Sequence, residues 1–213
     1  MRESMIYNPC IYQLREKSLR RMLDIIEQRK KALSNGLVLF GDSIFELYDV
    51  KNFISSDSIY NCGIGGASTD ELLWFIDEAV IKYQPSKVIL HVGTNDLGNT
   101  AMNSPRKIAM NIALMTNIIH KNLPKCQIYV FSPLPCIESK QDYYHVNGIR
   151  CNRFIQDITV FLEEYVDYAQ IVHVFDEFMN DDETNEALYS DALHPNSLGY
   201  KIITKKILEI MNL

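Results

Sequence analysis

Apolar residues recur along this chain with two different spacings, which predicts helices and strands in alternation. In the first segment they lie three and four positions apart, as on the buried face of an amphipathic helix; they are Leu19, Met22, Leu23 and Ile26. This predicts a helix over about residues 13–32, ended by Asn35 and Gly36. Residues 37–40 are a continuous apolar run ending at Gly41, which is typical of a strand buried on both faces.

The alternation continues to the end of the chain. Ser68 and Glu71 have the spacing of a capping box, and Ser104 followed by Pro105 fits an N-cap with proline at the first helical position. The later strands are expected at 58–61, 87–92, 127–131 and 171–175, and the later helices at 68–84, 105–122, 146–165 and 196–211.

Strands that alternate with helices in this way form parallel β-α-β units with helices on both faces of the sheet. We therefore expect an α/β fold, a three-layer α/β/α sandwich around a five-stranded parallel sheet. No repeat or linker divides the sequence, which predicts a single domain over residues 1–213 with the N-terminal helix packed on it. Ligands of such folds bind beyond the carboxyl ends of the strands.

Composition narrows the function classes. The 213 residues suit one domain, and 47% hydrophobic and 23% charged residues are ordinary for a folded protein. A formal net charge of −6 argues against a general affinity for nucleic acid or anionic membranes. The sequence has no signal-peptide pattern and no run near the ~20 apolar residues of a membrane span. We expect a cytoplasmic protein without stable membrane insertion.

The cysteines point to a reducing compartment. Their number is odd, and no CxxC pair or zinc-finger spacing occurs, which argues against a disulfide framework and a structural metal. The five are Cys10, Cys62, Cys126, Cys136 and Cys151.

Candidate chemistry lies in four polar loops, three of which follow predicted strands. They contain residues 41–43, 61–66, 93–96 and 191–196. A serine hydroxyl needs a general base within hydrogen-bond reach, and that base usually needs an acidic partner. Ser43, His194 and Asp191 could fill these roles. The backbone N–H of Gly63 and the side-chain amide of Asn95 could stabilise an oxyanion, with the Ser43 N–H as a further donor.

The nucleophile turn of the α/β-hydrolases is not encoded here, because the serine segment lacks the second glycine of GxSxG. The four loops instead read GDSI, NCGIGG, GTND and DALHPN, and in this order they resemble the blocks of the SGNH hydrolases, or GDSL lipase/esterase family. The pattern looks more like the compact bacterial esterases and the platelet-activating-factor acetylhydrolase subunits than the longer plant lipases. Ile44 stands where the family name has leucine.

The resemblance implies a flavodoxin-like SGNH fold and a serine mechanism without metal or cofactor. It assigns Ser43 as nucleophile, His194 as base, Asp191 as its partner, and Gly63 and Asn95 as oxyanion donors. We expect an esterase that hydrolyses small-molecule esters with small or medium acyl chains. One alternative is a non-catalytic binding module for an acylated sugar or a partner protein. Another is a nucleotide-binding protein, which the missing third glycine of GxGxxG disfavours.

Several other polar residues are expected to have structural roles. Asp42 and Asp96 are interpreted as structural, Asn196 as the N-cap of the last helix, and His91 as a hydrogen-bonded core histidine. Cys62 is expected to be a small buried residue. Tyr143, Tyr144 and His145 lie in a long loop after the fourth strand that could border an acyl pocket.

Overall fold

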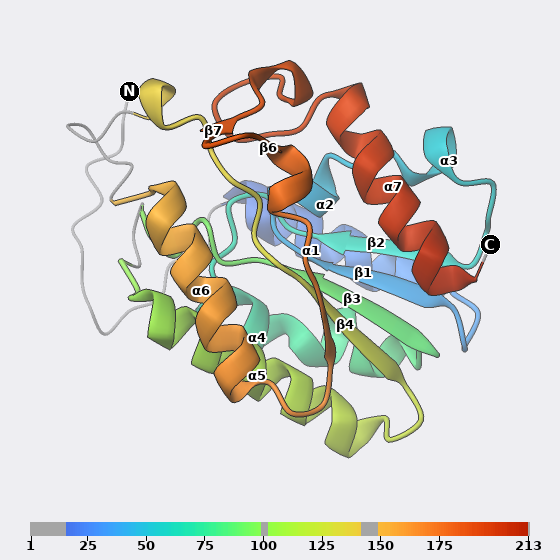
Figure 1. Ribbon diagram of the computed structural model, residues 1–213. Helices are drawn as coiled ribbons and strands as arrows, with labels where there is room; N and C mark the ends of the chain where they lie inside the picture. The colour runs from blue at the N-terminus through green and yellow to red at the C-terminus, as the bar shows by residue number, and fades with distance from the viewer. Residues whose placement is uncertain (1–15, 99–101, 142–148, 213) are drawn as a thin grey trace.

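The central sheet of the protein has five parallel strands in the order β2-β1-β3-β4-β5 (Figure 1). In this computed structural model the residues described are 16–98, 102–141 and 149–212. The strands are β1 (Leu37–Gly41), β2 (Ile59–Gly63), β3 (Lys87–His91), β4 (Gln127–Phe131) and β5 (Gln170–Val172). Both the α/β class and the parallel five-stranded sheet confirm the expectation, and the order is that of flavodoxin-like folds.

Helices cover both faces of this sheet. The longer helices are α1 (Glu16–Arg29), α4 (Thr69–Ala79), α5 (Pro105–Asn122), α6 (Asn152–Tyr165) and α7 (Ser197–Met211). Residues of α1, α4, α5 and α6 share one hydrophobic cluster with one face of the sheet. Helix α7 and the short α2 (Ser43–Glu46) and α3 (Val50–Phe53) share a second cluster with the other face. The two clusters lie between the sheet and the helices on either side of it, which gives the three layers seen in Figure 1.

Strand β1 lies inside the sheet because its alternate side chains serve both clusters. Val38 and Phe40 belong to one cluster and Leu37 and Leu39 to the other, and all four are buried. The continuous apolar run in the sequence has this cause. Strand β1 ends at Gly41, which pairs with Gly63 of β2 and with His91 of β3.

Several predicted boundaries differ from the observed ones. Helix α4 ends at Ala79 and a separate 3-10 turn follows over Ile81–Tyr83. Strand β5 ends at Val172 rather than 175, because the Ser132 hydroxyl accepts the N–H groups of Val174 and Phe175 and turns the chain. Helix α6 begins at Asn152, and the predicted start at 146 lies outside the described residues, as do positions 13–15 of the first helix.

Besides short 3-10 turns, four short helices and strands of the described residues were not predicted. They are α2, α3, and the antiparallel pair β6 (Met179–Asn180) and β7 (Glu183–Thr184). None is long enough to show a helical or strand period in the sequence. Among the helices of the described residues, none has both the length and the apolar content needed to cross a membrane.

Candidate active site

Ser43 lies at the turn between β1 and α2. Asp42 is the N-cap of α2, and its Oδ1 accepts the Ile44 N–H at 3.0 Å. Ser43 is therefore the first residue of the helix, directly beyond the carboxyl end of a buried strand. The structural role expected for Asp42 is the one observed.

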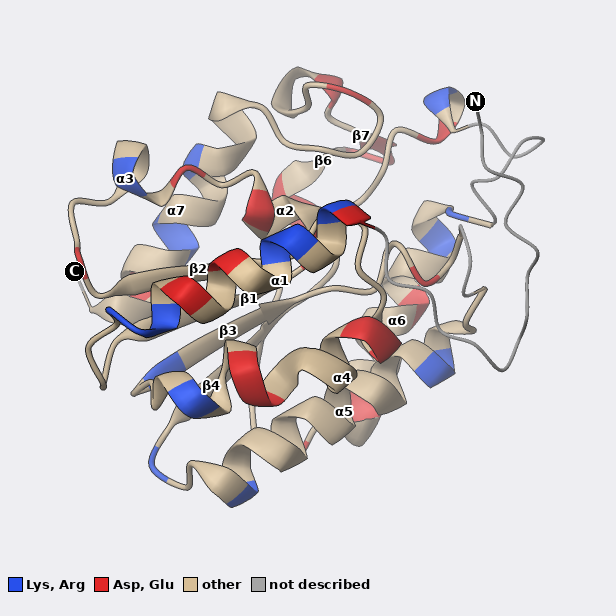
Figure 2. Ribbon diagram, turned by 180° about the vertical axis from the view of Figure 1, so that it is seen from behind, with Lys and Arg blue, Asp and Glu red and all other residues tan. Residues whose placement is uncertain are grey.

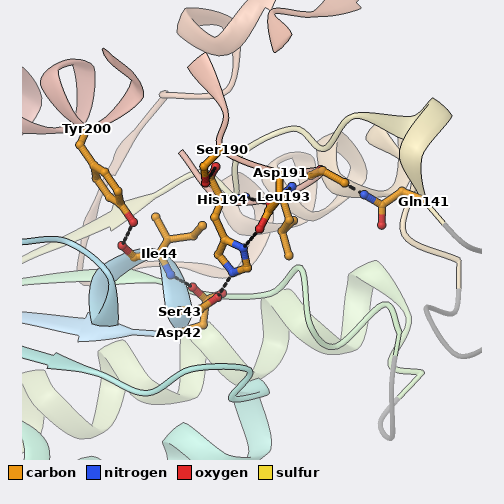
Figure 3. A network of polar contacts seen from close by, with 10 residues as sticks. Asp42, Ser43, Ile44, Gln141, Ser190, Asp191, Leu193, His194 and Tyr200 are labelled. Atoms are coloured by element: carbon orange, nitrogen blue, oxygen red, sulfur yellow. Dashed lines mark hydrogen bonds and ion pairs between the residues drawn. The ribbon is translucent and has the colours of Figure 1, made fainter. Parts of the chain in front are cut away.

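His194 and Asp191 meet Ser43 there, as Figure 3 shows. His194 Nε2 is 2.9 Å from Ser43 Oγ, and His194 Nδ1 is 2.8 Å from Asp191 Oδ2. The other carboxylate oxygen of Asp191 accepts the N–H groups of Leu193 and His194, both at 2.7 Å. The structure thus brings together the three residues that the sequence singled out, although Ser43 lies about 150 residues before the other two.

This hydrogen bonding controls the charge of Asp191. Partial burial opposes its ionisation, but the backbone N–H of His194, its imidazole and the N–H of Leu193 together outweigh burial and lower the pKa of the Asp191 carboxyl. An ionised Asp191 accepts a hydrogen bond from Nδ1, which leaves Nε2 of a neutral His194 as the acceptor facing Ser43. The His194 side chain is 25% exposed, so solvent reaches this pair.

Asn95 follows β3 and is buried. Its Nδ2 donates to the carbonyl of Ala67 at 3.1 Å, in the loop between β2 and α4. An amide nitrogen has two hydrogens, so one remains after this contact. The neighbouring Asp96 is turned away and accepts the N–H and hydroxyl of Thr69, which fixes the start of α4 and confirms its structural interpretation.

Gly63 does not fit the role expected for it. Its N–H donates to Asn61 Oδ1 at 2.9 Å, so this hydrogen is already used within its own loop. Gly63 is needed instead because a Cβ there would lie 2.2 Å from the backbone nitrogen of Glu46 in α2. The sequence could not show this, because a glycine is expected both where a backbone N–H binds a ligand and where another backbone packs closely.

Two other backbone donors are available at this edge. Gly66, with a φ of 71°, precedes Ala67, whose carbonyl contacts Asn95; a positive φ favours glycine. Neither the Gly66 N–H nor the Ser43 N–H has a hydrogen-bond acceptor among the described residues. The spacing of glycines did single out residues 63–66 but did not indicate which amide is unpaired.

The remaining expectations have mixed outcomes. Cys62 is buried, and burial raises the pKa of its thiol to about 12, so it is not a reactive thiolate. His91 is buried as expected, but neither ring nitrogen has a hydrogen bond within the described part of the chain; its Nδ1 lies 3.6 Å from Asp42 Oδ1. The loop residues 143–145 lie outside the described residues. The described ranges contain no group of three or more His, Cys, Asp or Glu arranged to hold a metal ion.

Comparison with known proteins places this chain in a family. The sequence profile of the GDSL-like lipase/acylhydrolase family matches residues 39–202. Platelet-activating factor acetylhydrolase IB subunit alpha1 of Bos taurus is 25% identical over 179 residues, which are 80% of this chain and 72% of the bovine one. A GDSL-like lipase from Bacteroides thetaiotaomicron superposes with a TM-score of 0.77 at 20% identity, over 90% of this chain and 97% of the other.

A longer relative also matches. N-acylneuraminate cytidylyltransferase of Escherichia coli O18:K1:H7 is 29% identical over 178 residues, which are 82% of this chain but only 40% of that protein. The chain therefore spans less than half the length of this relative. The family profile covers most of the chain, including the serine, glycine, asparagine and histidine loops, and the chain accordingly belongs to the GDSL-like lipase/acylhydrolase family.

Proposed function

We propose that this hydrolase is a serine esterase that forms an acyl-enzyme on Ser43. The observation that carries the proposal is the continuous pair of contacts from Asp191 to His194 and from His194 to Ser43, at 2.8 and 2.9 Å. In the first step His194 Nε2 takes the hydroxyl proton as Ser43 Oγ attacks the ester carbonyl. His194 then gives that proton to the leaving alcohol, and the acyl group stays on Ser43.

Water completes the cycle. His194 takes a proton from a water molecule that attacks the acyl-enzyme, and returns it to Ser43 as the carboxylic acid leaves. In both steps negative charge develops on the former carbonyl oxygen. We assign its stabilisation to the N–H of Ser43, the free amide hydrogen of Asn95 and the N–H of Gly66, which replaces Gly63 in this role.

The substrate class proposed is a small-molecule ester with a short or medium acyl chain. An acetylhydrolase and a protein named for an N-acylated sugar acid are among the relatives, so acetyl esters, including acetylated sugar acids, are the first substrates to test. The alternative of a non-catalytic binding module has less support, because a binding site needs no serine within hydrogen-bond distance of an oriented histidine.

The test is hydrolysis of p-nitrophenyl acetate, butyrate and octanoate by the wild type and by Ser43→Ala. We expect turnover by the wild type, highest with the shorter chains, and none above background by Ser43→Ala. Ser55→Ala is the matched control, because Ser55 is exposed between α3 and β2, at the end of the sheet opposite to Ser43. Equal activity of wild type and Ser43→Ala would rule out Ser43 as the nucleophile.

A fluorophosphonate probe distinguishes an inactive protein from a wrong substrate. It labels an activated serine without needing the natural ester. Labelling of the wild type but not of Ser43→Ala supports the mechanism even if the p-nitrophenyl esters are not hydrolysed. Absence of labelling in a folded wild type would favour the binding module.

A further inference from the structure

Helix α1 contacts the proposed oxyanion loop through one side chain, Arg21. Its Nε donates to the carbonyl of Gly63 and its Nη2 to the carbonyl of Asn61, both at 2.8 Å. Resting on the proposed function, we infer that Arg21 is a positioning residue for the loop that carries the Gly66 N–H. Helix α1 precedes residues 39–202, the part of the chain that matches the family profile.

The contact occurs where the sheet would otherwise be open. Strand β2 is an edge strand, and β1 pairs with only one of its sides. The Ile64 N–H donates inward to the carbonyl of Gly41, so Asn61 and Gly63, on the alternate positions, direct their carbonyls outward. Unpaired edge carbonyls take water or another partner. The forked guanidinium supplies two donors to this pair, in place of a neighbouring strand.

The same loop is attached to the helix of the proposed nucleophile. Asn61 Nδ2 donates to the carbonyls of Phe45 and Tyr48, the latter at 3.1 Å, and the carboxylate of Glu46 accepts the Gly65 N–H. From the other side, Lys17 Nζ of α1 lies 3.5 Å from Glu46 Oε1.

Helix α1 thus reaches both halves of the proposed site, the glycine loop through Arg21 and α2 through Lys17. Figure 2 shows α1 crossing the sheet with its N-terminal end beside α2. The exposure of the two contacts differs. Lys17 is 78% exposed, and an exposed ion pair contributes little, whereas Arg21 is half-buried and bound to two backbone carbonyls. Arg21 therefore carries the attachment.

Loss of Arg21 should change the rate more than the binding. Without it, the edge carbonyls turn toward water and the glycine loop gains freedom at the point where it leaves β2. A misplaced donor weakens the oxyanion interaction, which exists in the transition state and not in the ground state. The effect should therefore appear in kcat, with little change in KM.

The experiment compares Arg21→Ala and Arg21→Lys with Arg20→Ala, whose exposed side chain pairs only with Glu16 among the described residues. Each variant is assayed for kcat and KM with p-nitrophenyl acetate, for inhibition by a trifluoromethyl ketone, and for its melting temperature. We expect Arg21→Ala to lower kcat and the affinity for the ketone by about 10-fold, less than the 10²–10³ of a lost oxyanion donor. Arg21→Lys should be intermediate, and Arg20→Ala unchanged.

Added guanidinium, below concentrations that affect the melting temperature, provides a second readout. It should restore part of the kcat of Arg21→Ala and none of that of Asn95→Ala. A folded Arg21→Ala with wild-type kcat and ketone affinity, or with a loss confined to KM, would overturn the positioning role. If Ser43→Ala retained wild-type activity, the proposed function itself would fail, so the two failures are distinguishable.

Discussion

The side chain of His194 is oriented by Asp191, and this orientation determines which ring nitrogen faces Ser43. Its N–H and the N–H of Leu193 fix one oxygen of Asp191, and the other oxygen binds Nδ1 of the ring. The imidazole can therefore rotate little without breaking a contact on the same short loop. Nε2 is left facing Ser43 Oγ, so in the proposed mechanism the backbone of this loop helps to determine which ring nitrogen accepts the proton.

Asp191→Asn tests this arrangement. The amide can still accept the two backbone N–H groups, but it no longer favours the tautomer with the proton on Nδ1, so we expect kcat to fall about 10²–10⁴-fold with the fold intact. Because the pKa of the Asp191 carboxyl is lowered, the pH profile of the wild-type activity should show no limb from Asp191 at neutral pH. Steady-state kinetics over pH 5–9 measure both. Asp182→Asn, at an exposed position, is the control, and an unchanged kcat in Asp191→Asn would disprove the role.

At the scale of elements, the start of α7 links the last helix to the loop of His194. Asn196 is its N-cap, as predicted, and Oδ1 accepts the N–H of Leu198 at 2.8 Å. The Nδ2 of the same side chain donates to the carbonyls of Ala187 and Tyr189. One residue therefore ends the loop and begins the helix.

Asn196→Ala and Asn196→Asp separate these two functions. Alanine removes the cap and both amide contacts, so the free energy of unfolding should fall by about 1–2 kcal/mol. Aspartate keeps the cap oxygen, so it should lose less, while its second oxygen faces two carbonyls without donating to them. Chemical denaturation measures both values. Equal stability of Asn196→Ala and the wild type would contradict the capping role.

At the scale of the whole molecule, Asp96 connects the loop after β3 with the start of α4 and with the segment before α5. It accepts the N–H and hydroxyl of Thr69 at the start of α4 and the amide of Asn103 before α5. Burial raises the pKa of the Asp96 carboxyl to about 6, although the hydrogen bonds from Thr69 and Asn103 act in the opposite direction. The site loop after β3 is thereby fixed to two helices of one layer.

The raised pKa of Asp96 predicts how the free energy of unfolding changes with pH. Between about pH 4 and 6 the folded protein holds a proton on Asp96 that the unfolded chain has released, so this contribution to stability falls as pH rises through that window. In Asp96→Asn the side chain does not titrate, and its amide N–H groups face the donors of Thr69 and Asn103. This lowers the free energy of unfolding by about 1–3 kcal/mol. Its deficit in unfolding free energy should therefore be larger at pH 4 than at pH 7. Asp77→Asn, exposed on α4, should show no such change, and a deficit independent of pH would refute the assignment.

The sequence by itself determined the α/β class, the five strands and the residues that meet at the candidate site. Apolar runs and helical spacing are local, and they are visible in the sequence because the inner strands, above all β1, are buried on both faces and the helices on one. The serine, glycine and asparagine loops could be predicted to converge because parallel strands end at one edge of a sheet. The histidine loop follows no strand of this sheet, and its place beside Ser43 was expected from the chemistry of its residues.

Only the tertiary structure decided which groups are free to act. Gly63 and Gly66 are the same residue type three positions apart, but Asn61 occupies the N–H of the first. Arg21 belongs to a helix that looked like ordinary packing, and its contact with β2 spans about forty residues of chain. His91 looked like a hydrogen-bonded core residue and lacks such a bond among the described residues. Hydrogen-bond partners distant in sequence leave no local period, so the sequence indicates which residues gather and the fold determines what each one donates to.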